Sequence, residues 1–175
     1  MSGPQVRTRT PKDLRRQRRR RSHTCWDHLL VAPLWPMHDV NLGTLLRTCD
    51  ATGACLAVPK LPWVPEALAR GNTLRRRACV HWTGHNPVQW LADQRKRDDT
   101  TVLGIELAEE AVRLADLPPA RHRTVAVLGH ERTGIPPEAL DELDLVVEIP
   151  MIGTGASLNV AVAGSLVLYR LAGLM

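Results

Sequence analysis

Six short runs of apolar residues recur along the chain, and proline, glycine or polar residues interrupt the sequence between them. These runs occupy residues 28–32, 54–58, 78–82, 101–107, 124–128 and 145–149. Runs of this length that are apolar on both sides are typical of strands buried inside a parallel sheet. The apolar pattern therefore predicts six strands of one parallel sheet.

Helical spacing of apolar residues appears between several of these runs. Residues 42–51 place Leu42, Leu45, Leu46 and Cys49 at helical intervals, and Gly53 suits the end of that helix. Strands that alternate with helices predict an α/β fold, a parallel sheet flanked by helices, without a second domain. A proline-rich stretch at residues 59–65 predicts a loop. Further helices are expected at residues 87–95, 109–114, 136–140 and 156–171.

The C-terminal thirty residues are unusually apolar, because residues 149–169 contain no charged side chain. A membrane span is disfavoured, since Pro150, Gly153, Ser157 and Asn159 place polar and helix-breaking residues in its first half. The second half predicts a helix buried on all sides, in a core or against another subunit. Two interpretations stay open, a capped core helix or a ligand-binding loop that leads into a helix.

The positive charge of the chain is concentrated at its start. The net charge is +5 and the pI is about 9.5, whereas residues 1–22 alone carry +8 and leave −3 for the remaining 153 residues. We therefore divide the chain into a basic arm, residues 1–22, and a domain, residues 23–175. An arginine-rich arm suits a polyanion such as RNA, although a solubilising tail is equally consistent. The candidate RNA contacts in the arm are Arg15, Arg16, Arg18 and Arg19.

A second basic stretch precedes the third predicted strand. Arg70, Arg75, Arg76 and Arg77 lie within eight residues of one another. Phosphate binding and a merely solvated loop are both consistent with such a stretch. We retain Arg75, Arg76 and Arg77 as candidate RNA contacts.

The cysteines do not predict a disulfide framework or a metal site. None of the four forms a C-x-x-C pair, and the N-terminus lacks the apolar region of a signal peptide, so reduced thiols and a cytoplasmic location are expected. Cys79, His81 and His85 offer three zinc ligands within seven residues, but the nearby sequence supplies no fourth. We therefore expect no metal.

Three stretches with polar and glycine residues follow predicted strands. The first is Asn41-x-Gly43-x-x-x-Arg47 with Gly53, the second is residues 128–135 (LGHERTGI), and the third is residues 149–159 (IPMIGTGASLN). In parallel α/β sheets, ligands bind beyond the carboxyl ends of the strands. The architecture therefore predicts that these three stretches converge.

In this order and spacing, the three stretches resemble the SpoU/TrmH branch of the SPOUT methyltransferases, over roughly residues 29–171. The resemblance implies a C-terminal trefoil knot, a bent S-adenosylmethionine held by the knot loops, and a homodimer. It also implies methylation of a ribose 2′-hydroxyl of RNA. Residues 46–53, 129–135 and 149–153 look most like the tRNA enzymes that methylate a D-loop guanosine.

Five polar residues are candidates for roles in the reaction, Arg47, Ser157 and Asn159 from the resemblance and Asn41 and Glu131 from their chemistry. Arg47 matches the arginine that acts at the 2′-hydroxyl and phosphate end of the reaction, and its permanent charge suits a phosphate or a developing alkoxide. Asn41 is expected to cap the following helix or to orient Arg47, and Glu131 to position Arg47 or a backbone amide. Ser157 and Asn159 are expected to hold the ribose or the arginine.

Six further residues are candidates for the cofactor site, where backbone groups and shape would cup the adenine. They are Ile105, Leu128, Gly129, Ile149, Met151 and Leu158. The reaction itself requires no metal, because a sulfonium already carries an activated methyl group.

The sequence thus predicts an S-adenosylmethionine-dependent RNA 2′-O-methyltransferase, with tRNA as the leading substrate and rRNA as the alternative. A catalytically silent RNA-binding protein of the same fold is the competitor from another class. A dinucleotide-binding oxidoreductase is disfavoured, because no Gly-x-Gly-x-x-Gly turn follows an early strand.

Overall fold

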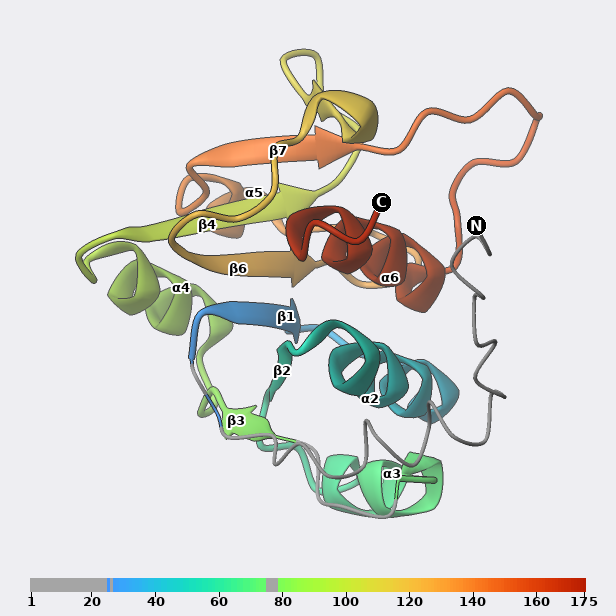
Figure 1. Ribbon diagram of the computed structural model, residues 1–175. Coiled ribbons are helices and arrows are strands. Elements are labelled where there is room, and N and C mark those ends of the chain that lie inside the picture. Colours follow the sequence, from blue (N-terminus) through green and yellow to red (C-terminus); the bar gives the residue numbers. More distant parts are fainter. Residues whose placement is uncertain (1–24, 26, 75–78) are drawn as a thin grey trace, which may run out of the picture.

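A seven-stranded sheet in which every neighbouring pair is parallel forms the centre of the domain (Figure 1). The computed structural model describes residues 25, 27–74 and 79–175. The strand order across the sheet is β3-β2-β1-β6-β4-β7-β5. The strands are β1 (Leu29–Pro33), β2 (Cys55–Val58), β3 (Val80–Trp82), β4 (Thr100–Ile105), β5 (Val112–Arg113), β6 (Arg123–Leu128) and β7 (Leu145–Glu148).

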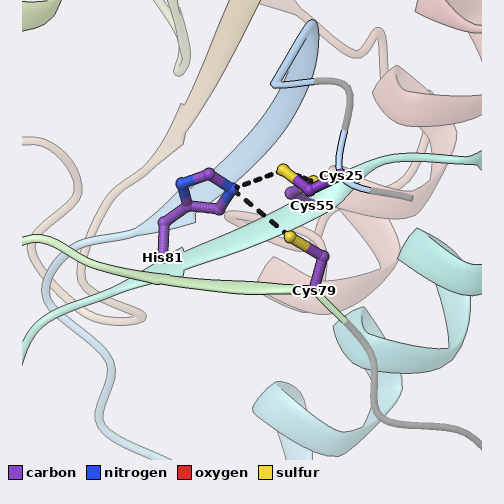
Figure 2. Close-up of side chains that lie close together, drawn as sticks. All are labelled: Cys25, Cys55, Cys79 and His81. Carbon is purple, nitrogen blue, oxygen red and sulfur yellow. Dashed lines mark hydrogen bonds between the residues drawn. The ribbon is translucent and has the colours of Figure 1, made fainter. Parts of the chain in front are cut away.

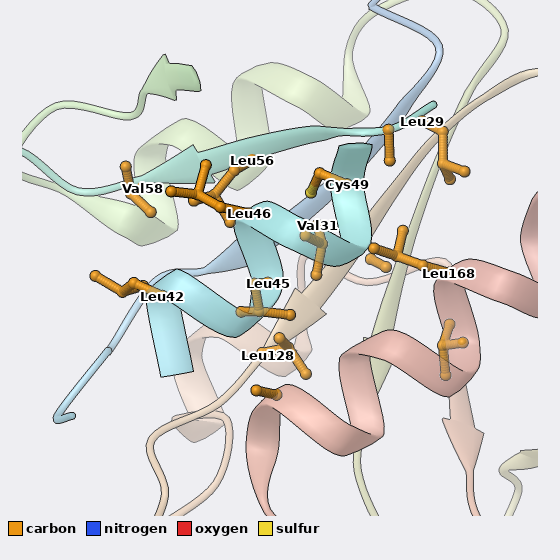
Figure 3. Close-up of a cluster of buried hydrophobic side chains, with 14 of the residues drawn as sticks. Leu29, Val31, Leu42, Leu45, Leu46, Cys49, Leu56, Val58, Leu128 and Leu168 are labelled. Atoms are coloured by element: carbon orange, nitrogen blue, oxygen red, sulfur yellow. The ribbon is translucent and has the colours of Figure 1, made fainter. Parts of the chain in front are cut away.

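Helices cover both faces of the sheet. They are α2 (Asp39–Thr52), α3 (Val64–Gly71), α4 (Pro87–Arg95), α5 (Pro137–Leu140) and α6 (Val160–Leu171), with a short 3-10 helix, η1 (Leu114–Asp116). Side chains of a strand point alternately to opposite faces. Leu29 and Val31 of β1 accordingly pack with α2 and α6 (Figure 3), and Leu30 and Ala32 pack on the other face with α4 and α5. This two-layer core confirms the predicted α/β class.

Three predicted elements differ from the structure. The helix expected at residues 109–114 is wrong, because the two-residue strand β5 pairs there with β7 and η1 follows it. The proline-rich loop expected at residues 59–65 ends in α3, where Pro65 occupies the first helical turn, a position that tolerates proline. Helix α6 begins at Val160 rather than Ala156, since the side chain of Asn159 caps it.

Helices α2 and α3 cross with their backbones in contact, and this contact explains the glycine of the first motif. A Cβ atom placed on Gly43 would lie 2.8 Å from Cα of Gly71, and one placed on Gly71 would lie 2.5 Å from Cα of Gly43. Side chains larger than hydrogen at either position would push the helices apart. The crossing therefore holds the helix that carries Arg47 against its neighbour.

The C-terminal helix is packed on one side and open on the other. Gly164 lies against Leu128 and Leu45, and Ser165 hydrogen-bonds Thr48 of α2 at 2.7 Å between side-chain oxygens. Val162 is 46% exposed, however. Burial on all sides within the core of one chain is therefore wrong for this helix, and burial of its open side against another subunit stays a prediction. No helix in the described ranges has the length and apolar character needed to span a bilayer.

Candidate active site

A cavity of about 790 Å³ opens at the carboxyl edge of the sheet. Its walls come from the loops after three adjacent strands, β6, β4 and β7, together with the start of α6. The volume lies in the range of small-molecule sites, and the edge is where parallel α/β sheets bind ligands. The cavity is therefore the candidate site for a small ligand.

All six candidate cofactor residues line this cavity. They are Ile105, Leu128, Gly129, Ile149, Met151 and Leu158. Leu128 is buried at the end of β6, whereas Met151 and Leu158 are 40% and 39% exposed on the loop between β7 and α6. The loop is the outer wall of the cavity, and it extends away from the sheet before it returns to α6 (Figure 1).

The glycines of the second motif give its loop a compact shape. A Cβ atom on Gly129 would lie 2.3 Å from the carbonyl carbon of Gly134, and Gly134 itself has a φ of +71°. A left-handed φ favours glycine. His130 and Gly134 also exchange backbone hydrogen bonds of 2.9 Å, so the turn closes on itself beside the cavity.

Glu106 is a cavity residue that the sequence analysis missed. Its carboxylate accepts hydrogen bonds from the backbone amides of Ile135 and Leu107, both at 3.1 Å, and so joins the loop after β4 to the glycine loop. The predicted strand of residues 101–107 included Glu106, whereas β4 ends at Ile105, so its place after a strand end is known only from the structure. A single carboxylate outside the three motifs gave no further reason to select it.

The side chains of Glu131, Asn41 and Asn159 form a hydrogen-bonded chain. Asn41 Nδ2 donates to Glu131 Oε1 at 3.1 Å, and Asn159 Nδ2 donates to Asn41 Oδ1 at 3.0 Å. Each residue belongs to a different motif. The chain therefore confirms the prediction that the three stretches converge.

The Glu131 carboxylate holds the loop between β1 and α2. It accepts from the backbone amides of Met37, at 3.1 and 3.2 Å, and His38, at 3.2 Å. Partial burial raises the pKa of Glu131, but hydrogen bonds from its own amide, Asn41, Met37 and His38 outweigh this effect. The pKa therefore lies below its ordinary value. This carboxylate is ionised at neutral pH and acts as an acceptor.

The two asparagines have positions that differ in part from expectation. Helix α2 begins after His38, so Asn41 lies within the first turn and does not cap the helix; that prediction is wrong. Asn159 is the cap of α6, because its Oδ1 accepts from the amides of Ala161 and Val162 at 2.9 and 3.2 Å. The Nδ2 group of Asn159 meanwhile donates to Asn41 Oδ1.

Arg47 lies on the exposed side of α2, where its guanidinium donates to the hydroxyl of Thr73. Neither Glu131 nor Asn41 is its hydrogen-bond partner within the described part of the chain, and Arg47 does not line the cavity of its own chain. Within one chain Glu131 thus takes the backbone-amide alternative. Orientation of Arg47 by Glu131 or Asn41 stays a prediction for an assembly in which Arg47 reaches the cavity of a second copy. Thr73 was missed, since nothing in its sequence context marks it.

The remaining candidate residues are Ser157 and the arginines of the two basic stretches. Ser157 is exposed and lines the cavity. Arg70 forms a 2.8 Å ion pair with Asp39 and a 3.5 Å pair with Glu66. The other candidate RNA contacts lie outside the described residues: Arg15, Arg16, Arg18, Arg19, Arg75, Arg76 and Arg77.

Known proteins resemble the chain in sequence and in fold. The tRNA (guanosine(18)-2′-O)-methyltransferase of Aquifex aeolicus is 31% identical over 138 residues, which cover 76% of this chain and 63% of that protein. The 23S rRNA (guanosine(2553)-2′-O)-methyltransferase RlmP of Bacillus subtilis is 33% identical over 138 residues, 76% of this chain and 53% of that protein. This chain thus spans less than two thirds of either relative.

A solved structure agrees. The TrmH/SpoU tRNA modifying enzyme of A. aeolicus superposes with a TM-score of 0.72 and 28% identity, covering 93% of this chain and 82% of that one. The sequence profile of the SpoU rRNA Methylase family matches residues 29–169, which include all three motifs. These matches confirm the resemblance found from the motifs, and the chain belongs to the SpoU rRNA Methylase family.

Proposed function

We propose that the protein is an S-adenosylmethionine-dependent RNA 2′-O-methyltransferase. The observation that carries the proposal is the cavity at the carboxyl edge of the sheet, beside which one hydrogen-bonded chain joins all three family motifs. The activities for which the relatives are named, 2′-O-methylation of a tRNA guanosine and of a 23S rRNA guanosine, support the reaction type.

The cavity suits an adenosyl cofactor in its chemistry. Its lining includes the apolar Leu128, Ile105 and Ile149, and the compact glycine loop brings backbone groups to the wall. Flat apolar walls and backbone hydrogen-bonding groups recognise an adenine by shape and edge. The bound cofactor would supply an activated methyl group on its sulfonium.

The protein groups would act on the RNA nucleophile. A ribose 2′-hydroxyl is a weak nucleophile that must lose its proton as it attacks, and a guanidinium nearby favours the developing alkoxide or grips the adjacent phosphate. Arg47 is exposed on α2, and among the described residues its hydrogen-bond partner is the neutral hydroxyl of Thr73. Its guanidinium can therefore leave this hydroxyl and bind an anionic group of the RNA.

A homodimer accounts for the exposed apolar side of α6. An apolar hollow of about 370 Å³ there is lined by Thr44, Val162, Ser165, Leu166, Tyr169 and Met175. Thr44 is one helical turn before Arg47 on α2. A second copy that packs on this hollow would lie next to Arg47. Because Arg47 does not line the cavity of its own chain, we expect it to act at the cavity of the partner.

We also propose the trefoil knot implied by the family. Arg170 near the end of α6 donates to the carbonyl of Ala115 at 2.7 Å and to that of Leu117, and the amide of Ala120 donates to Leu171 at 2.8 Å. A C-terminal segment that passes through the connection between β5 and β6 must lie against it in this way. These contacts support the knot.

Between substrates, tRNA is the leading proposal and rRNA the alternative. Relatives named for each RNA match a similar share of this chain at similar identity, so the ranking rests on the motif likeness given above. If the basic stretch binds phosphate, neutralising Arg75, Arg76 and Arg77 lowers RNA affinity and flattens its salt dependence. An unchanged slope of log affinity against log salt contradicts that role.

The substitution Arg47→Ala tests the proposed reaction. We expect methyl transfer from labelled S-adenosylmethionine to RNA to be abolished, while cofactor binding measured by calorimetry stays close to wild type. The control is Arg121→Ala, an exposed arginine before β6 at the opposite edge of the sheet, which should transfer normally. Normal transfer by Arg47→Ala contradicts the role assigned to this residue.

A further inference from the structure

Four potential metal ligands converge at the edge of the sheet opposite the cavity. The ligand atoms of Cys25, Cys55, Cys79 and His81 all lie within 4.8 Å of one another (Figure 2). Cys25 Sγ is 3.6 Å from Cys55 Sγ and 3.3 Å from His81 Nε2, and Cys79 Sγ is 3.4 Å from the same Nε2. This cluster joins three segments that are distant in sequence.

The parallel sheet explains how the cluster forms. Cys55 is the first residue of β2, Cys79 directly precedes Val80 of β3, and Leu56 pairs with Val80 in the register of these strands. His81 is the next residue of β3, and Cys25 precedes β1. Cys25 and Cys55 could not be assigned to this cluster from the sequence, because only the sheet brings them to Cys79. His85, considered there as a ligand, is not part of the cluster found among the described residues.

The spacing of the four atoms matches that of a tetrahedral zinc site. With Zn–S bonds of about 2.3 Å and Zn–N bonds of about 2.05 Å, a tetrahedron has S–S edges of about 3.8 Å and S–N edges of about 3.6 Å. Three of the six separations, at 3.6, 3.3 and 3.4 Å, are slightly shorter than these edges, and all six are within 4.8 Å. A metal ion at the centre therefore requires only small movements of the ligands.

Hydrogen bonds among the four side chains explain their close approach less well than a bound metal ion does. The Nε2 atom of a neutral imidazole carries either one hydrogen or one lone pair, yet the thiols of Cys25 and Cys79 both approach it within 3.4 Å. Only one of them can form a good hydrogen bond with it. A cation that binds all four atoms satisfies each of them.

We propose that Cys25, Cys55, Cys79 and His81 bind one structural zinc ion. Three thiolates and one imidazole are a common set for structural zinc, and four protein ligands leave no open position for catalysis. Binding would release the protons of the thiols into the buffer, since the metal takes the thiolate form. The ion would fix the segment before β1 to the edge strand β3 and to its neighbour β2.

The position of the site suggests what the zinc contributes. It lies where β2 starts, whereas the cavity lies where β4, β6 and β7 end, so the ion takes no part in methyl transfer. Cys25 is the ligand closest in sequence to the arginine-rich residues 1–22. The zinc would therefore fix the point at which the basic arm joins the domain, and this gives the site a structural role in presenting the arm.

Metal analysis of the full chain tests the proposal. We expect protein purified under reducing conditions from zinc-supplemented medium to carry one zinc per chain by plasma mass spectrometry. Cys79→Ser and His81→Ala should lose the zinc. His81→Cys should retain it, because a fourth thiolate replaces the imidazole. The matched controls are Cys49→Ala, the cysteine outside the cluster, and His85→Ala, the neighbouring exposed histidine; both should keep the full amount.

A second measurement covers variants that fail to fold. Wild-type protein stripped of metal and titrated with Co²⁺ should show thiolate-to-cobalt charge transfer and the intense visible bands of a tetrahedral site, saturating at one ion per chain. Folded wild-type protein that carries no zinc and gives no such spectrum overturns the proposal. Zinc retained by His81→Ala also overturns the proposal. So does a Cys25–Cys55 disulfide in protein that is freshly purified under reducing conditions and holds no metal.

Discussion

Replacement of Glu131 by glutamine tests whether its carboxylate organises the site. The carboxylate accepts from two backbone amides, those of Met37 and His38, and from the side chain of Asn41. Glutamine keeps the shape but loses the charge, and it turns an NH₂ group toward donors. The loop after β1 and the first turn of α2 would then lose their common acceptor.

The size of the effect follows from these contacts. Hydrogen bonds to a charged group contribute about 1.5–3 kcal/mol each, against about 0.5–1.5 kcal/mol for neutral ones. Glutamine retains one accepting oxygen, and the site is partly open to solvent. We therefore expect Glu131→Gln to lower the free energy of unfolding by about 1–3 kcal/mol at neutral pH.

The pH dependence gives an independent check with a defined sign. The pKa of Glu131 is lowered in the folded state, so its stabilisation is fully present above the ordinary value of 4.5 and is lost as the pH falls through the folded value. The difference between wild type and Glu131→Gln should shrink below pH 4.5.

Urea unfolding at a series of pH values measures this difference. The control is Glu138→Gln on α5, an exposed glutamate outside the hydrogen-bonded chain, which should leave the stability at neutral pH nearly unchanged. Equal unfolding free energies for wild type and Glu131→Gln at neutral pH refute the reasoning. A difference that persists unchanged into acid also refutes it.

Three further predictions concern the glycines and the apolar side of α6. Gly129→Ala should weaken cofactor binding in calorimetry, because its Cβ would lie 2.3 Å from Gly134; wild-type affinity contradicts this. Gly71→Ala should lower the free energy of unfolding in urea by about 1–3 kcal/mol through overpacking against Gly43, and an unchanged midpoint contradicts it. Val162→Asp should yield monomers in analytical ultracentrifugation and abolish transfer, whereas an intact active dimer counts against the proposed interface.

Much of the fold follows from local patterns in the chain. The six predicted strands were recognisable because buried parallel strands are apolar on both faces, as in β1 and β6. The two-residue β5 was not, since its pairing with β7 depends on a neighbour more than thirty residues away. The start of α6 was misplaced because apolar residues continue through the loop before Asn159, and only the capping side chain marks the boundary.

The cavity residues that directly follow strands could be predicted from the sequence, because the strand ends determine their position. Residues such as Gly129 and Ile149 follow strands directly, so the topology alone carries them to one edge and into one cavity. The pairing of Arg47 with Thr73 depends instead on how α2 packs against the segment after α3, which no local pattern encodes. The same holds for the cysteine cluster, which forms only when β2 and β3 pair in register and the segment before β1 lies beside them.

Methyl transfer from radiolabelled S-adenosylmethionine to separate tRNA and rRNA pools, followed by nucleoside analysis, tests the central claim most directly. The proposed function predicts a 2′-O-methylnucleoside in one pool, tRNA first, which would identify the reaction and the substrate class together. Absence of transfer to both pools with cofactor binding intact contradicts the enzymatic assignment to these RNAs and favours a silent RNA-binding protein. Absence of cofactor binding contradicts the function proposed for the cavity.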